Sequence, residues 1–195
     1  MPRLPCLSGA GYTERMTLKK WTCAEYQRLA DLGILQPHDK LELIEGDIVE
    51  MSPQNLPTAM SVTHATSILV YAYSLTHYVR VQLPLNVGMN SQPEPDFAVV
   101  LKGVVDGAST HPQTADLVVE VSESSLAFDR REKMLIYGAG GLPEYWIINV
   151  IDGVLEVHRD PDSKIGYRSR QFYKKEDHVT ALFAPEVQIS VATLF

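Results

Sequence analysis

Two short runs of the chain are apolar at successive positions, PDFAVVL at 95–101 and DLVVEVS at 116–122. A strand with one face in water alternates apolar and polar residues, whereas a strand covered on both faces is apolar almost throughout. The two runs therefore predict central strands of a sheet with chain packed on each side. This favours a layered fold in which helices cover a sheet.

The rest of the pattern supplies the strands and helices for those layers. A capping-box pattern, Thr22 followed by Glu25, opens a helix expected at 23–32. Apolar residues at helical spacing predict further helices at 58–76 and 127–139. We expect a hairpin of two strands around 45–47, and further strands at 78–85, 96–101, 116–121 and 143–150. A loop over 103–115 would join the strands at 96–101 and 116–121. The segments GVLEVHRD and YRSRQFYKK predict an antiparallel extension after the last of these strands. The predicted fold class is α/β (α+β), a mixed central β-sheet flanked by helices, with an N-terminal hairpin and a C-terminal antiparallel extension.

The chain has 195 residues, 45% of them hydrophobic, which is enough for one core and does not require two. We expect a single domain over 17–195 after a disordered tail over 1–16, with Met16 as an alternative start. The tail lacks the apolar region of a secretory signal, and no stretch reaches the length of a membrane span. Cys6 and Cys23 fit a reducing compartment better than a disulfide framework, so we expect a cytoplasmic protein.

The formal net charge of −7 argues against a protein that coats polyanions in general. It does not exclude a metal-dependent nuclease, because clustered carboxylates lower the net charge and a bound divalent cation reverses the local sign. The stretch RDPDSKIGYRSRQFYKK at 159–175 gathers six basic residues against two aspartates. On the sequence alone, a solvated edge hairpin is the favoured interpretation of that stretch.

Each central run contains one carboxylate where an apolar residue would cost less, Asp96 in the first and Glu120 in the second. Taken alone, Asp96 is an ordinary strand-start aspartate that bonds nearby amides. Glu120 has apolar neighbours on both sides, and a buried glutamate is costly unless it is paired or bound to metal. Carboxylates from two adjacent strands, with the carbonyl of Val121 and water, would suit Mg²⁺ or Mn²⁺.

A nuclease-type site also needs a cation, and the position two residues after Glu120 holds Ser122 rather than a lysine. Lys133, on the helix that follows, is the candidate replacement, with Asp129 four residues earlier on the same helical face. The alternative is a solvent-facing ion pair between these two residues. The helix directly follows the Glu120 strand, so a long lysine stem could return the ammonium to the metal site.

Together these residues resemble the PD-(D/E)XK nuclease superfamily in the variant where the lysine migrates: PD at Pro95–Asp96, EVS at 120–122 and D-x-x-x-K at 129–133. The segments LELIEGDIVEMSP, PDFAVV, LVVEVSESS and DRREKMLIYGAGGLPEYWIINV, in this order, resemble more closely the Uma-two group of proposed restriction endonucleases. The resemblance implies the restriction-endonuclease-like fold and a Mg²⁺ site. It also matches Glu42 to the glutamate of the family's ELI-x-G motif, and His64 to a histidine that often opens the long helix. Glu94 adds a carboxylate to the usual pattern.

Three of these positions have ordinary structural interpretations beside the functional ones. Glu42 alternates with leucines, so an exposed hairpin residue and a third carboxylate of the metal shell are about equally favoured. His64 has no second histidine at helical spacing, which favours a capping or packing role. The glycines of GAGG at 138–141 follow a helix rather than a strand, so we interpret them as a helix C-cap and not as a dinucleotide loop.

The function that these residues favour is Mg²⁺- or Mn²⁺-dependent hydrolysis of nucleic-acid phosphodiesters, with DNA as the expected partner. Asp96 and Glu120 would hold the metal, Lys133 would orient water or stabilise charge at phosphorus, and Asp129 would position Lys133. The alternative is a non-catalytic nucleic-acid or protein-binding module that keeps the nuclease fold. A small-molecule phosphoesterase is a weaker third possibility. Cutting both strands of a duplex needs two sites, so we expect a homodimer that uses the edge near GVLEVH or the helix near 58–76.

Overall fold

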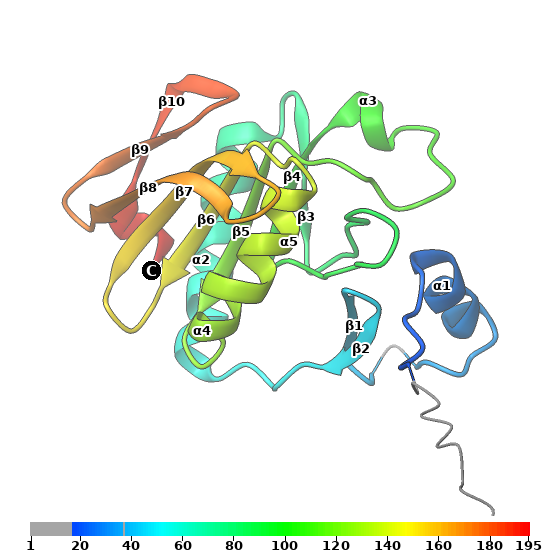
Figure 1. Ribbon diagram of the computed structural model, residues 1–195. Helices are drawn as coiled ribbons and strands as arrows, with labels where there is room; N and C mark the ends of the chain where they lie inside the picture. The colour runs from blue at the N-terminus through cyan, green and yellow to red at the C-terminus, as the bar shows by residue number, and fades with distance from the viewer. Residues whose placement is uncertain (1–16, 37) are drawn as a thin grey trace, which may run out of the picture.

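The structure is a computed structural model that describes residues 17–36 and 38–195, so the tail predicted at 1–16 lies outside the described residues. Its centre is a six-stranded sheet in the order β3-β4-β5-β6-β7-β8 (Figure 1). The strands are β3 (His77–Val81), β4 (Phe97–Leu101), β5 (Leu117–Ser122), β6 (Glu144–Asn149), β7 (Val154–Asp162) and β8 (Gly166–Lys174). Only β5 and β6 run parallel within this sheet, and the other neighbours are antiparallel. The predicted mixed sheet is confirmed.

Helices cover both faces of the sheet, as the apolar runs predict (Figure 1). α2 (Leu56–Tyr73) lies on one face. On the other face lies the crossover that joins the parallel strands β5 and β6, made of α4 (Leu126–Phe128), the π-helical turn η1 (Asp129–Lys133) and α5 (Met134–Ala139). The expected helix at 127–139 is therefore present, but with a π-helical turn at its centre.

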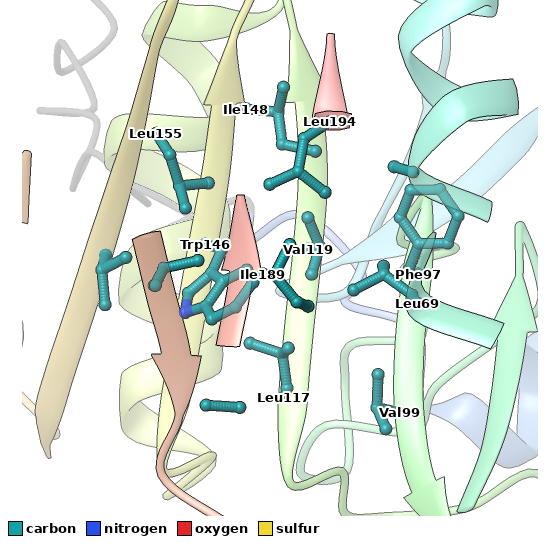
Figure 2. Packing of buried hydrophobic residues seen from close by; sticks show 14 of the residues in the cluster. Leu69, Phe97, Val99, Leu117, Val119, Trp146, Ile148, Leu155, Ile189 and Leu194 are labelled. Atoms are coloured by element: carbon teal, nitrogen blue, oxygen red, sulfur yellow. The ribbon is translucent and has the colours of Figure 1, made fainter. Parts of the chain in front are cut away.

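The alternation of side chains along the strands divides the core into two clusters. The α2 side contains Leu69, Phe97, Val119 and Trp146, together with residues near the C-terminus such as Leu194 (Figure 2). The α5 side contains the residues of alternate parity, among them Ala98, Val118, Tyr145, Ile147 and, from the helix, Ile136. Glu120 and Ser122 have the parity of Val118 and therefore face the α5 side.

The N-terminal elements follow their sequence signals closely. α1 (Cys23–Asp31) has the complete capping box, with Thr22 Oγ1 accepting from the Glu25 amide at 3.2 Å and Glu25 Oε2 accepting from the Thr22 amide at 2.9 Å. β1 (Leu41–Ile44) and β2 (Asp47–Glu50) form the predicted hairpin. Its turn places Glu45 and Gly46 at positive φ, as tight two-residue hairpins require.

Four expectations are corrected. α2 begins at Leu56 rather than residue 58, because the Asn55 side chain caps it, and it ends at Tyr73 rather than 76. β3 stops at Val81 rather than at 85, since Gln82 has a positive φ that breaks the strand. The expected loop over 103–115 opens with a short helix, α3 (Lys102–Val105). GVLEVH is not a sheet edge, because β7 pairs with β6 on one side and β8 on the other.

The chain end adds elements that have no counterpart among the predictions. β9 (His178–Ala181) and β10 (Ala184–Ser190) form a separate two-stranded sheet, and the 3-10 turn η2 (Val191–Leu194) packs against α2. His64 on α2 contacts this end of the chain, with Nδ1 2.6 Å from the carbonyl oxygen of Phe195. Within the described ranges, none of the helices combines the length and the apolarity that a membrane crossing requires.

Glu156 on β7 fixes the crossover helix to the sheet. Its fully buried carboxylate accepts hydrogen bonds from Arg130 of η1, from Nη2 at 2.6 Å and from Nε at 3.1 Å, and from Asn149 Nδ2 at 3.1 Å. Burial opposes ionisation, but these donors outweigh it and lower the pKa of Glu156 to about 2. His158, whose Nε2 lies 3.9 Å from the carboxylate, contributes to this lowering of the pKa together with Arg130 and Asn149.

Glu156 should therefore make stability depend on acid pH. A carboxylate with a lowered native pKa stabilises the fold above its unfolded pKa, near 4.5, and that stability is lost as pH falls toward 2. The loss should reach about 3 kcal/mol in the free energy of unfolding. Urea denaturation of wild type and Glu156→Gln should show a large difference at pH 7 that shrinks by pH 3. A difference that is constant with pH would contradict this assignment.

Candidate active site

Strand register brings the two predicted metal carboxylates together. Phe97 of β4 pairs with Val119 of β5, which places Asp96, just before β4, beside Glu120. The Asp96 amide donates to Glu120 Oε2 at 3.3 Å, and the Val121 amide donates to Asp96 Oδ2 at 2.8 Å. Both side chains are buried, with Asp96 8% and Glu120 4% exposed. The carbonyl of Val121 faces the same space as its amide, because both groups of a strand residue point to the same neighbour.

Lys133 returns to this carboxylate pair from the helix. Its ammonium Nζ lies 3.0 Å from Glu120 Oε1 and 3.2 Å from Glu42 Oε1, and the residue is 2% exposed. Lys133 is therefore buried and does not form the solvent-facing ion pair with Asp129 that was the alternative interpretation. The ammonium occupies the space beside Glu120 that a lysine at position 122 would reach, because residues 120 and 122 point to the same face of β5.

Glu42 belongs to the same cluster rather than to an exposed hairpin. It is 4% exposed, and its Oε1 accepts from Lys133 Nζ and from the Glu94 amide at 3.1 Å. Its second oxygen, Oε2, is buried without a hydrogen-bond partner among the described residues. A buried carboxylate oxygen without a donor is costly, and a cation or a water would satisfy it.

Asp129 lies close to the cluster but has other partners than predicted. Its Oδ2 accepts from the hydroxyls of Ser122 and Ser125, each at 2.7 Å. Among the described residues, the ion pairs of Lys133 are with Glu42 and Glu120, and Asp129 is not one of them. The reason is the π-helical turn, in which the Met134 amide bonds the carbonyl of Asp129 five residues earlier, so residues four apart no longer align as in an α-helix.

Three site residues were absent from the sequence predictions. Tyr137 OH donates to Glu120 Oε1 at 2.8 Å, and its position four residues after Lys133 on a helix could have indicated this contact. Gln54 and Gln82 both donate to Asp96 Oδ1, at 3.1 and 3.0 Å. Gln82 reaches Asp96 from a backbone at positive φ, for which the sequence has no glycine or asparagine signal.

The buried carboxylates and the Lys133 ammonium strongly shift one another's pKa values. Burial raises the pKa of Glu120 to about 8, against the nearby Lys133 ammonium that lowers it. Burial likewise raises the pKa of Asp96 and of Asp129. For Lys133, burial lowers the pKa, but the surrounding carboxylates outweigh it and raise the pKa above its ordinary value, so the ammonium remains charged. The carboxylates around Lys133 therefore outnumber the positive charge that its ammonium supplies, which a divalent cation would correct.

The cluster lines a cavity of about 520 Å³ between the β1–β2 hairpin, the 51–55 loop and the start of the crossover helix. Glu94 lines it too, whereas His64 does not. No set of three histidine, cysteine, aspartate or glutamate side chains in the described part of the chain is arranged to hold a metal. A two-carboxylate site completed by a backbone carbonyl is compatible with this, and a water could satisfy the unpartnered Oε2 of Glu42.

Comparisons with known proteins agree with this fold. Residues 23–192 match the family Uma2, described as "Putative restriction endonuclease". A crystal structure titled as a "putative nuclease belonging to DUF820" from Anabaena variabilis ATCC 29413 superposes with a TM-score of 0.68 at 16% identity, over 85% of this chain and 94% of that chain. No curated protein matches. At that identity, the structural match supports the fold alone.

Proposed function

The chain belongs to the Uma2 family, and from this we propose that it is a Mg²⁺- or Mn²⁺-dependent endonuclease that hydrolyses nucleic-acid phosphodiesters, with DNA as the expected substrate. One observation carries the proposal. Lys133 Nζ lies 3.0 Å from Glu120 in a cavity that Asp96 also lines. Paired carboxylates with an adjacent lysine are the groups that metal-assisted phosphodiester hydrolysis needs. We place this activity in the cytoplasm.

The residues divide the work by their contacts. Asp96, Glu120 and the Val121 carbonyl would hold the cation, which when bound supplies positive charge against the scissile phosphate. Lys133 would orient the attacking water or stabilise charge that develops on phosphorus. Glu42 holds Lys133 in place through their 3.2 Å ion pair. Asp129 joins the end of β5 to the start of the helix through Ser122 and Ser125.

Side chains on the outer strand β8 are consistent with the proposal that the substrate is a polyanion. The exposed residues of β8 at alternate positions include Arg170, Phe172 and Lys174. Register pairs Phe172 with Glu156 and Glu156 with Ile147, which in turn pairs with Glu120, so these residues share the sheet face of the cavity. Basic and aromatic side chains on one face suit phosphate contacts and base stacking. The positive charges of the basic side chains would also offset the repulsion between the acidic cavity and a polyanionic substrate.

Metal binding is the first test. Calorimetry should show Mn²⁺ binding to the wild type that weakens at least about 10-fold in Asp96→Asn and in Glu120→Gln, because each variant removes one carboxylate ligand. Glu123→Gln is the matched control, since Glu123 lines the same cavity but bonds Thr58. Equal affinity in all four proteins would refute the site assignment.

Cleavage is the second readout of the same four proteins. Plasmid DNA incubated with Mn²⁺ should be cut by the wild type and by Glu123→Gln, and not by the two ligand variants. A wild type that binds Mn²⁺ and DNA but cuts no nucleic acid would favour the binding module that keeps the nuclease fold.

A further inference from the structure

We infer that the outer face of α2 is a homodimer interface, on which a second copy of the chain packs antiparallel through its own α2. α2 has 18 residues and contains no aspartate, glutamate, lysine or arginine. A helix on the surface of a globular protein normally has charged residues on its outer side. Here that side is exposed and uncharged, which is typical of a helix that is buried on both sides.

The exposed residues of α2 form one stripe. Leu56, Met60, Val70 and Tyr71 are 73%, 44%, 40% and 91% exposed, and Thr63 and Ser67 between them are also exposed. The positions 56, 60, 63, 67 and 70 are spaced by four and three residues in turn, which is the spacing of a helix–helix seam. The buried residues Ala65, Leu69 and Tyr73 lie on the opposite side, against the sheet.

The polar residues of the stripe do not oppose its burial. Thr63 Oγ1 donates to the carbonyl of Ala59 at 2.8 Å, and Ser67 Oγ donates to the carbonyl of Thr63 at 3.3 Å. Both hydroxyl protons are therefore satisfied within the helix, so covering these side chains leaves no donor without a partner. Their small size also allows two helices to approach closely at the centre of the stripe.

The stripe is complementary to itself. A two-fold axis midway between residues 63 and 67 places Thr63 opposite Ser67 of the second copy and Met60 opposite Val70 of the second copy. Larger side chains then pack beside each end of the small central pair, from both copies alike, as an isologous contact requires. The net charge of −7 makes most approaches of two copies repulsive, whereas this face brings no charge to the contact.

The geometry also relates the two candidate active sites. Asn55 and Thr58, at the N-terminal end of α2, line the cavity. An 18-residue helix is about 27 Å long, so antiparallel packing would place the two cavities near opposite ends of the pair. The dimer does not depend on the proposed hydrolysis, since a monomer could still cleave and an inactive protein could still dimerise.

Sedimentation velocity tests the interface. A single helix pair buries less surface than the roughly 800 Å² per partner of a usual protein–protein interface. We therefore expect monomer and dimer to interconvert reversibly at protein concentrations between about 1 and 100 µM. Met60→Glu/Val70→Glu should be monomeric over this range with unchanged circular dichroism. The control Met89→Glu/Ile151→Glu introduces the same charge at exposed apolar residues elsewhere and should dimerise as the wild type does. A monomeric wild type, or a Met60→Glu/Val70→Glu protein that still dimerises, overturns the inference.

Cysteine cross-linking tests the register without depending on the charged variants. In a Cys6→Ser/Cys23→Ser background, a mixture of Thr63→Cys and Ser67→Cys proteins should form disulfide-linked dimers faster than either protein alone. The reason is that residue 63 faces residue 67 across the two-fold axis. Equal rates in the mixture and in both separate proteins would overturn the antiparallel packing.

Discussion

Replacement of Lys133 by alanine is expected to reduce metal-dependent DNA cleavage by about 100- to 1000-fold, the usual cost of losing a buried group that stabilises the transition state. Mn²⁺ affinity should change far less, because Lys133 is not a ligand. The expectation rests on the position of its ammonium, 3.0 Å from Glu120 Oε1 inside the cavity. Cleavage rates and calorimetry on the same preparation check the two parts together.

Lys133 also neutralises buried carboxylates, so the variant must be shown to fold. Without the ammonium, Glu42 and Glu120 remain buried without their shared counter-ion, which destabilises the metal-free protein. Near-ultraviolet circular dichroism should therefore be recorded with Mn²⁺ present. A folded Lys133→Ala protein that binds Mn²⁺ and cleaves at the wild-type rate would refute the role of Lys133.

A second-site change can separate a chemical role from a structural one. Lys133→Ala/Ser122→Lys should recover part of the lost activity, because residues 122 and 120 share a face of β5 and the new stem can enter the vacated space. Ser125→Lys in the same background is the matched control. It removes a similar hydroxyl bond to Asp129, but it lies at the start of the helix rather than on the strand. Equal recovery of cleavage activity in both double variants would contradict the idea that activity requires the ammonium at this particular position.

The sheet and its helices could be predicted because their signals are local. Continuous apolar runs identified β4 and β5, and the capping box identified α1. The ends of the elements were less predictable. For example, β3 ends before Gln82 because this residue has a positive φ, which a glutamine in the sequence does not indicate. The β9–β10 sheet was missed because its short strands, with burial confined to a few positions, resemble surface loop in sequence.

The site was predictable in its members and not in all its contacts. Asp96, Glu120 and Lys133 were identified because a charge within an apolar run, or on a helix that must pack over it, needs a partner. Asp129 was assigned to Lys133 by α-helical spacing, which the π-helical turn of η1 changes. The depth of Glu42 depends on how the β1–β2 hairpin docks, and strand alternation alone does not specify that.

The GAGG segment shows how a local signal can hide a tertiary one. Gly141, at φ +71°, has the left-handed conformation of a helix C-terminus, in agreement with the predicted C-cap. Gly138 lies inside α5 and has a different reason to be glycine. The backbone of α5 there touches the backbone of Gly166 at the start of β8, and a Cβ at either position would meet main-chain atoms of the other element.

Substitution of Gly138 by alanine should therefore destabilise the protein by about 3 kcal/mol or more, because the added methyl would overlap the Gly166 backbone and neither element can yield by a side-chain rotation. The matched control is Gly103→Ala in α3, where a Cβ meets nothing within 4 Å. That change should be neutral or slightly stabilising, since alanine favours helices. Urea denaturation measures both.

Gly138→Ala should also impair catalysis in whatever fraction still folds. Gly138 lies five residues after Lys133 on the continuous helix, so a shift of α5 away from β8 moves the ammonium relative to Glu120. A displacement of about 1 Å can cost about 100-fold in rate. With the protein kept folded by Mn²⁺ at low temperature, the cleavage rate should fall more than Mn²⁺ affinity does. Wild-type stability and rate in Gly138→Ala would show that the contact between α5 and β8 does not fix the position of Lys133.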